Sequence, residues 1–188
     1  MTRAKGPGES PLLLLDVIEI LNRHQIPYAV IGALAASFYG VVRVSNDADA
    51  VVSLRLAGAD IQTLLQGFQK AGLKTTHRMG DLSDQIGAVI NVEDSYDNRV
   101  DLLMDIRGME EEVFSRTIQA KLEGAPVRIV GMEDFIAMKL FAAGPQDLID
   151  VAEALKVSGS QFDKTLLKKL AQGYGKETQR RLEALLKS

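Results

Sequence analysis

The sequence predicts an α+β fold, in which a mixed β-sheet flanked by helices is followed by a helical C-terminal third. Short apolar segments bounded by turn residues alternate with amphipathic segments up to residue 131, and apolar residues recur at helical spacing from Glu133 onward. A length of 188 residues suits one main domain. We therefore expect a flexible leader at 1–10, an α/β core at 11–131, and a C-terminal helical region at 132–188 packed on the core.

Composition narrows the classes of protein to consider. The chain contains no cysteine, which excludes disulfides, thiolate-bound zinc, iron–sulfur clusters and cysteine nucleophiles. Asp16 and Glu19 interrupt the apolar run near the N-terminus, which does not fit a signal peptide. No window reaches the roughly 18 to 20 uninterrupted apolar residues of a membrane span. We expect a cytoplasmic protein with no membrane partner.

The first predicted helix covers residues 11–24. Ser10 and Pro11 form a typical helix start, with the serine hydroxyl as the cap and the proline in the first turn, and Leu14, Val17 and Leu21 then share one face. The other predicted elements of the core are a strand at 28–31, a short helix from Gly32 to Gly40, a strand at 47–54, a helix at 60–72, and strands at 73–78, 86–92 and 99–106.

Turn residues indicate how the later elements connect. The sequence "EDSYDN" between the strands at 86–92 and 99–106 predicts a hairpin. For residues 117–130, with "EGAP" in the middle, two interpretations stay open: a second, smaller hairpin, or a passage from helix to strand. The C-terminal region is predicted to contain helices at 133–143, 146–157, 161–173 and 176–187.

The segment "VSNDADAVV" places two aspartates one residue apart in an otherwise apolar strand. Side chains alternate between the faces of a strand, so Asp47 and Asp49 share a face, with Cβ atoms roughly 6 to 7 Å apart. Two carboxylates this close repel each other unless a proton or a cation lies between them. A solvated strand end and a proton-sharing pair are two interpretations. A hard divalent cation is the third, and it suits carboxylate oxygens and commonly brings phosphates as further ligands.

Two further features favour a site for metal and phosphate. Gly32 and Ala33 follow a predicted strand and open a helix, so their backbone N–H groups can face an anion. Asp101 interrupts the apolar run "RVDLLMDI", and a third carboxylate on a neighbouring strand is what a two-metal site needs. Asp105, four residues later on the same face, is the reserve candidate.

Three segments together resemble a known family: "VIGALAASFYGVVRVSNDADAVV", "NRVDLLMDI" and "EDFIAMKLFAAGPQDLIDVAEAL". They resemble the minimal nucleotidyltransferases of the DNA polymerase β superfamily, and most closely the AbiEii-like group found in toxin–antitoxin and phage-defence loci. The family signature is a hydrophobic residue, a glycine, then glycine or serine, followed by an aspartate-x-aspartate and a third acid on a later strand. Arg43 and Ser45 match a basic–polar pair that often precedes the metal pair.

The resemblance implies a nucleotidyltransferase that holds Mg²⁺ or Mn²⁺ on Asp47, Asp49 and Asp101. Such an enzyme moves a nucleoside monophosphate from a nucleoside triphosphate such as ATP to an acceptor hydroxyl and releases pyrophosphate. The residues implied in nucleotide binding are Gly32, Ala33, Arg43, Ser45 and Lys139. The implied acceptors are RNA such as tRNA, a protein or a small molecule, and a cognate toxin or antitoxin is an implied partner.

The chain departs from the family pattern at two places. Ala33 stands where many members have glycine or serine, and Gln146 lies where the family often has basic residues. These departures favour a second hypothesis, a catalytically inactive relative that binds nucleotide or a partner. A third hypothesis is a glycosyltransferase, whose aspartate pair also holds a metal diphosphate. For Lys139, a phosphate contact and a surface lysine both stay open. Asp147 is expected to cap its helix, and a contact with Lys139 or Arg43 is the functional alternative.

Overall fold

The computed structural model describes residues 3–41, 47–81, 83–159 and 161–187. The helices are α1 (Ser10–Arg23), α2 (Gly32–Phe38), α3 (Leu54–Ala57), α4 (Ile61–Lys70), the 3₁₀ helix η1 (Glu111–Phe114), α5 (Met132–Ala142), α6 (Pro145–Ser158), α7 (Lys164–Gly173) and α8 (Lys176–Leu185). The strands are β1 (Tyr28–Val30), β2 (Asp47–Val52), β3 (Lys74–Met79), β4 (Ile86–Glu93), β5 (Arg99–Ile106), β6 (Ile118–Leu122) and β7 (Ala125–Ile129).

The strands form one mixed sheet in the order β3-β4-β5-β2-β1-β7-β6. β2 pairs parallel with β5, and β1 pairs parallel with β7, whereas the other neighbours are antiparallel. The predicted α+β class is therefore confirmed. The hairpin of β4 and β5 is confirmed as well, and residues 117–130 form the smaller hairpin, β6 and β7.

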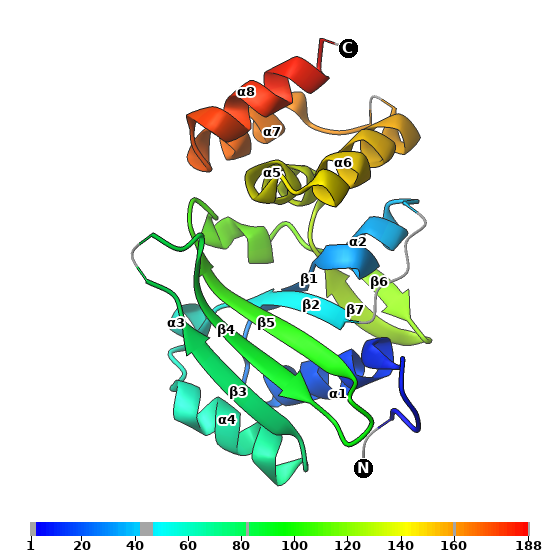
Figure 1. Cartoon of the computed structure of the whole chain (residues 1–188), viewed down its shortest axis with the longest axis vertical. Helices are drawn as coiled ribbons and strands as arrows, with labels where there is room; N and C mark the ends of the chain where they lie inside the picture. The colour runs from blue at the N-terminus through cyan, green and yellow to red at the C-terminus, as the bar shows by residue number, and fades with distance from the viewer. Residues whose placement is uncertain (1–2, 42–46, 82, 160, 188) are drawn as a thin grey trace.

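Helices α1 and α4 cover one face of the sheet (Figure 1). On β5, the buried residues Val100, Leu102 and Met104 alternate with Arg99 and Asp101, which are only partly buried. Because successive side chains of a strand point to opposite faces, the apolar set packs towards α1 and the polar set lies on the opposite face. This alternation leaves one side of the sheet free to carry polar side chains.

The C-terminal helices gather at the other end of the molecule, above α2 and η1 (Figure 1). α5 lies at the centre of this region and contacts α6, α7 and α8. Its buried residues include Phe135, Ile136, Ala137 and Leu140, which are not confined to one face. A helix that is buried on several sides has to be covered by neighbouring elements, and α6, α7 and α8 supply part of that cover.

The start of α1 differs from the prediction. The helix begins at Ser10, and the preceding Glu9 makes no side-chain capping bond. The Ser10 hydroxyl instead accepts a hydrogen bond from the Arg99 backbone N–H at 3.1 Å. The predicted capping role of Ser10 is wrong, because this hydroxyl connects the helix to β5.

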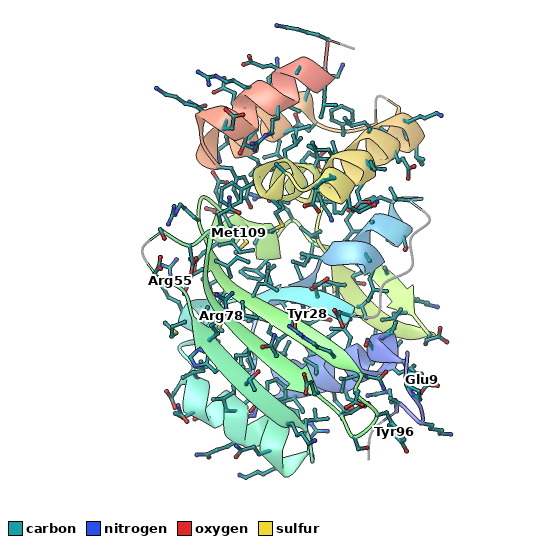
Figure 2. All side chains as sticks on the ribbon, in the orientation of Figure 1. Glu9, Tyr28, Arg55, Arg78, Tyr96 and Met109 are labelled. Carbon is teal, nitrogen blue, oxygen red and sulfur yellow. The ribbon has the colours of Figure 1, made fainter. Side chains whose placement is uncertain are left out.

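Residues 3–9, which were expected to form part of a flexible leader, contact the core. Ala4 is buried, and the Glu9 N–H donates to Asn98 Oδ1 at 2.7 Å. Figure 2 shows Glu9 and Tyr96 at the same end of the molecule, where this segment meets the turn between β4 and β5. Among the described residues, no helix is both long and apolar enough to cross a lipid bilayer.

Candidate active site

The pairing of β2 with β5 brings the predicted carboxylates together. Asp49 lies opposite Asp101, and Asp47 lies opposite Arg99. Because pairing residues on adjacent strands share a face, all three aspartates lie on the side of the sheet away from α1. Asp105 is exposed and lies four residues further along β5, about 13 Å from Asp101. The register therefore favours Asp101 over Asp105 as the neighbour of the pair.

The turn between β1 and α2 approaches Asp49 very closely. Gly32 has φ +65°, and a Cβ at this position would lie 2.0 Å from Asp49 Oδ2. The Ile31 N–H also donates to the Asp49 backbone carbonyl at 2.9 Å. Only glycine combines this left-handed backbone with the absence of a side chain. Gly32 therefore permits the observed position of the Asp49 carboxylate, which the sequence motif alone did not reveal.

The Asp101 carboxylate is held by two side chains that were not predicted. Arg99 Nε donates to Asp101 Oδ1 at 2.7 Å, and Arg99 Nη2 donates to Oδ2 at 2.9 Å. Asn91 Nδ2 donates to Oδ1 at 2.8 Å, and Asn91 Oδ1 accepts from the Thr76 hydroxyl at 3.0 Å. The hydrogen bond to Asp101 raises the pKa of the Arg99 guanidinium, which stays charged.

The sequence did contain a signal for each of these residues. Arg99 precedes Asp101 by two positions, and residues two apart on a strand share a face. Asn91 is the single amide in the apolar strand "IGAVINV", and asparagine is uncommon within strands. The signal for Asn91 does not say which partner its side chain takes, because that partner lies on another strand.

A pocket of about 180 Å³ lies between the sheet and the C-terminal helices. Its lining is mostly apolar and includes Ile86, Leu103, Ile106, Phe135, Met138 and Phe141. Asp49, Gln85, Lys139 and Asp147 supply the charged and amide groups of the lining, which also includes Gly32. The pocket thus joins the carboxylate face of the sheet to α5 and α6.

Lys139 lies in this lining and is buried. Its Nζ is 2.6 Å from Asp147 Oδ1 and 2.9 Å from Asp150 Oδ2. Only 9% of Lys139 is exposed, so the surface-lysine interpretation is wrong. Asp147 Oδ2 also accepts from the Gly144 N–H at 3.1 Å, which confirms its predicted role as a cap of α6. Gln146 donates to Asp150 at 2.9 Å, so the residue that replaces a basic one supports this ion-pair cluster.

The remaining predicted residues divide into two groups. Ala33 is 5% exposed and belongs to the first turn of α2, next to Gly32. Arg43 and Ser45 lie outside the described residues.

Among the described side chains, no three acidic or histidine residues stand together as a cluster ready to hold a metal ion. Asp101 is paired with Arg99 in this conformation, although the hard oxygen donors of Asp47, Asp49 and Asp101 are the type that divalent cations prefer.

The aspartate pair on β2, the third aspartate in register on β5 and the glycine turn against the pair agree with the nucleotidyltransferase signature that the sequence resembles. The family model described as "Nucleotidyl transferase of unknown function (DUF2204)" matches residues 12–188, and the chain belongs to this family. No curated protein matches the chain.

Several solved structures share the fold. ANT(2")-Ia in complex with adenylyl-2"-tobramycin aligns with a TM-score of 0.60 at 16% identity, covering 88% of this chain and 98% of that one. A nucleotidyltransferase-like antigenic protein from Paracoccidioides brasiliensis aligns at 0.51 and 15% identity over 98% and 95%. The lincosamide antibiotic adenylyltransferase LnuA aligns at 0.51 and 12% identity over 81% and 98%. At these identities the similarity establishes a nucleotidyltransferase-like fold.

Proposed function

We propose that this protein is a metal-dependent nucleotidyltransferase, which moves a nucleoside monophosphate from a nucleoside triphosphate such as ATP to an acceptor hydroxyl. The register that places Asp49 beside Asp101, with Asp47 on the same face, is the observation that carries the proposal. The family match supports nucleotidyl transfer as the general chemistry. The roles of individual residues are our inference from their positions.

Asp47, Asp49 and Asp101 would hold Mg²⁺ or Mn²⁺. The fit rests on three carboxylates that share one face of adjacent strands, with Gly32 leaving room for the oxygens of Asp49. When bound, such ions neutralise phosphate charge and make an acceptor hydroxyl easier to deprotonate.

The nucleotide would lie between the Gly32–Ala33 turn and the pocket. The triphosphate would face the aspartates, and the mostly apolar pocket would receive the nucleoside. Lys139 would contact a phosphate from its place in the pocket lining, where Asp147 and Asp150 hold its ammonium group. Arg43 and Ser45, which precede β2, are proposed as further nucleotide contacts from the sequence.

Asp101 would act on the acceptor. Its carboxylate would orient the acceptor hydroxyl and accept its proton, so that the hydroxyl oxygen attacks the α-phosphorus in line. A phosphorus–oxygen bond to the acceptor forms as the bond to the leaving oxygen breaks, and pyrophosphate departs with that electron pair. The protein contributes mainly position and charge neutralisation.

The acceptor is a small hydroxyl-bearing molecule, a protein, or an RNA such as tRNA. The small-molecule class draws support from ANT(2")-Ia, which was solved with adenylyl-2"-tobramycin, and from LnuA, which is named an antibiotic adenylyltransferase. A role as one component of a toxin–antitoxin pair, of the AbiEii-like kind, stays a prediction from the sequence and would require a cognate partner.

The test is transfer of label from α-labelled nucleoside triphosphates to a panel of tRNA, proteins and small alcohols in the presence of Mg²⁺. We expect Asp47→Asn to reduce transfer by about 100-fold or more, since it removes a metal-holding carboxylate. Asp105→Asn is the matched control, because Asp105 is an exposed aspartate on β5 away from the pair. Transfer that Asp47→Asn leaves unchanged would refute the proposal. Tight triphosphate binding without transfer to any acceptor would instead support a catalytically inactive, nucleotide-binding protein.

A further inference from the structure

Charged side chains of alternating sign form a row across the four strands β2, β5, β4 and β3, on the face of the sheet away from α1. Asp47 on β2 lies opposite Arg99 on β5, Arg99 lies opposite Glu93 on β4, and Glu93 lies opposite Lys74 on β3. Pairing residues share a face, so these four form one row. Arg99 therefore has an acidic neighbour on each adjacent strand, in addition to Asp101 two positions along its own strand.

Of these acidic neighbours, Asp101 is the one to which Arg99 is seen to donate hydrogen bonds. Its guanidinium makes two hydrogen bonds to Asp101, at 2.7 and 2.9 Å. Glu93 is half-buried, and its side chain makes no hydrogen bond or ion pair with any other part of the chain that the structure describes. The charges of Asp47 and Glu93 nevertheless act on Arg99, since they add to the effect of Asp101 in raising its pKa. Glu93 is thus an available second partner for the guanidinium.

The two oxygens of Asp101 are held unequally. Oδ1 accepts from both Arg99 and Asn91, whereas Arg99 is the donor at Oδ2. The Asn91 amide is itself fixed by the Thr76 hydroxyl at 3.0 Å. If Arg99 moved away, Asn91 would still orient the carboxylate while Oδ2 became available.

A guanidinium and a divalent cation at the same carboxylate oxygens disfavour each other, because like charges repel at that distance. We propose that Arg99 and a divalent cation compete for Asp101, and that Glu93 receives the Arg99 guanidinium when the cation binds. This inference rests on the proposed function. Arg99 and Glu93 are positioning residues, which determine when Asp101 is available to the cation and the acceptor.

The exchange of Arg99 between Asp101 and Glu93 keeps the charges of the site balanced with and without a cation. Asp47, Asp49 and Asp101 share one face of two paired strands, and without a cation Arg99 offsets the negative charge of Asp101. With a cation bound, the positive charge of Arg99 would be unfavourable there, and a move of one strand to Glu93 keeps it paired with an acid.

The test is Mn²⁺ binding to the full chain without nucleotide, measured by electron paramagnetic resonance or calorimetry. We expect Arg99→Gln to tighten Mn²⁺ binding by about fivefold, since it removes the competitor, and Glu93→Gln to weaken it by about threefold, since it removes the alternative partner. In the double variant, the effect of Glu93→Gln should disappear, because Glu93 acts only through Arg99.

Simple electrostatics makes a different prediction for the double variant. If Glu93 merely adds negative potential, its effect is independent of Arg99 and the two changes are additive. Arg78→Gln is the charge control, because Arg78 (labelled in Figure 2) is an exposed arginine on β3, opposite Val89 on β4. It should leave Mn²⁺ affinity nearly unchanged. Arg99→Lys, which keeps the charge but loses the two-pronged geometry, should give an intermediate affinity.

Each outcome bears on the proposal. The proposal is supported if Arg99→Gln tightens Mn²⁺ binding, Glu93→Gln weakens it, and the two effects are not additive in the double variant. Additive effects, or Mn²⁺ affinity that is the same in the wild type and in Arg99→Gln, overturn it while leaving the metal site intact. Absence of Mn²⁺ binding in every variant, including the wild type, overturns both this inference and the metal site of the proposed function.

Discussion

Gly32→Ala should separate the backbone role of this glycine from its role beside Asp49. The new Cβ would lie 2.0 Å from Asp49 Oδ2, so the carboxylate would have to retreat to at least 3.4 Å to regain ordinary contact. Alanine in the left-handed region costs roughly 1 kcal/mol, which lowers Tm by about 2–4 °C for a chain of this length. A shift of a reacting group by more than about 1 Å can cost 100-fold in rate, and we expect a loss of that order in nucleotidyl transfer.

The matched control is Gly58→Ala. Gly58 has φ +58°, close to the +65° of Gly32, and a Cβ there would meet no atom within 4 Å. Both variants should lose the stability that a left-handed alanine costs, and Gly32→Ala should lose more because it also displaces the Asp49 carboxylate. Only Gly32→Ala should lose Mn²⁺ binding and transfer. If Gly32→Ala binds Mn²⁺ as well as Gly58→Ala does, the position of the Asp49 carboxylate does not depend on Gly32, and the reasoning is refuted.

Three further predictions concern stability. Lys139→Met should lower the free energy of unfolding by about 3 kcal/mol in urea denaturation, because it removes the ammonium group that lies 2.9 Å from the fully buried carboxylate of Asp150; a loss near zero would contradict this. Tyr39→Phe removes the hydrogen bond from the hydroxyl to the Val130 carbonyl at 2.6 Å and should cost about 1–2 kcal/mol, whereas unchanged stability would indicate that the carbonyl finds another donor. Burial raises the pKa of Tyr39 and Tyr174 above the ordinary 10.0, so the unfolded state loses these protons at a lower pH than the folded state does. The free energy of unfolding should therefore be at its full value below pH 10.0 and fall as the pH rises above it. A urea midpoint that stays constant across that range would show that the two pKa values are not raised.

Local sequence patterns were sufficient for most of the elements. The two-residue alternation of β5 and the helical spacing of α1 depend only on neighbouring residues, and both were predicted. α3 and η1 are four residues long, which is too short for a periodic signal, and neither was predicted. The Ser10 prediction failed for a different reason, since the hydroxyl is used by a backbone N–H 89 positions away.

Part of the candidate site could also be predicted. Asp47 and Asp49 share a face because they are two residues apart on a strand, and that is a local property. Gly32 was predicted in a turn before a helix, but its contact with Asp49 was not. For Lys139, the two interpretations taken from the sequence could not be separated, because the carboxylates that bury it lie on the next helix and become its neighbours only when α6 packs against α5.

The sequence by itself determined which residue types line one face of each strand, since side-chain alternation is set by the backbone of the strand alone. Only the tertiary structure decided that β5 pairs with β2, and in a register that places Asp101 rather than Asp105 beside Asp49. Arg99 lies between two acidic neighbours because β5 pairs with β2 on one side and with β4 on the other, and the pairing with β4 also brings Asn91 to Asp101. Strand order and register depend on burial and hydrogen bonding summed over the whole sheet, and no single segment contains that information.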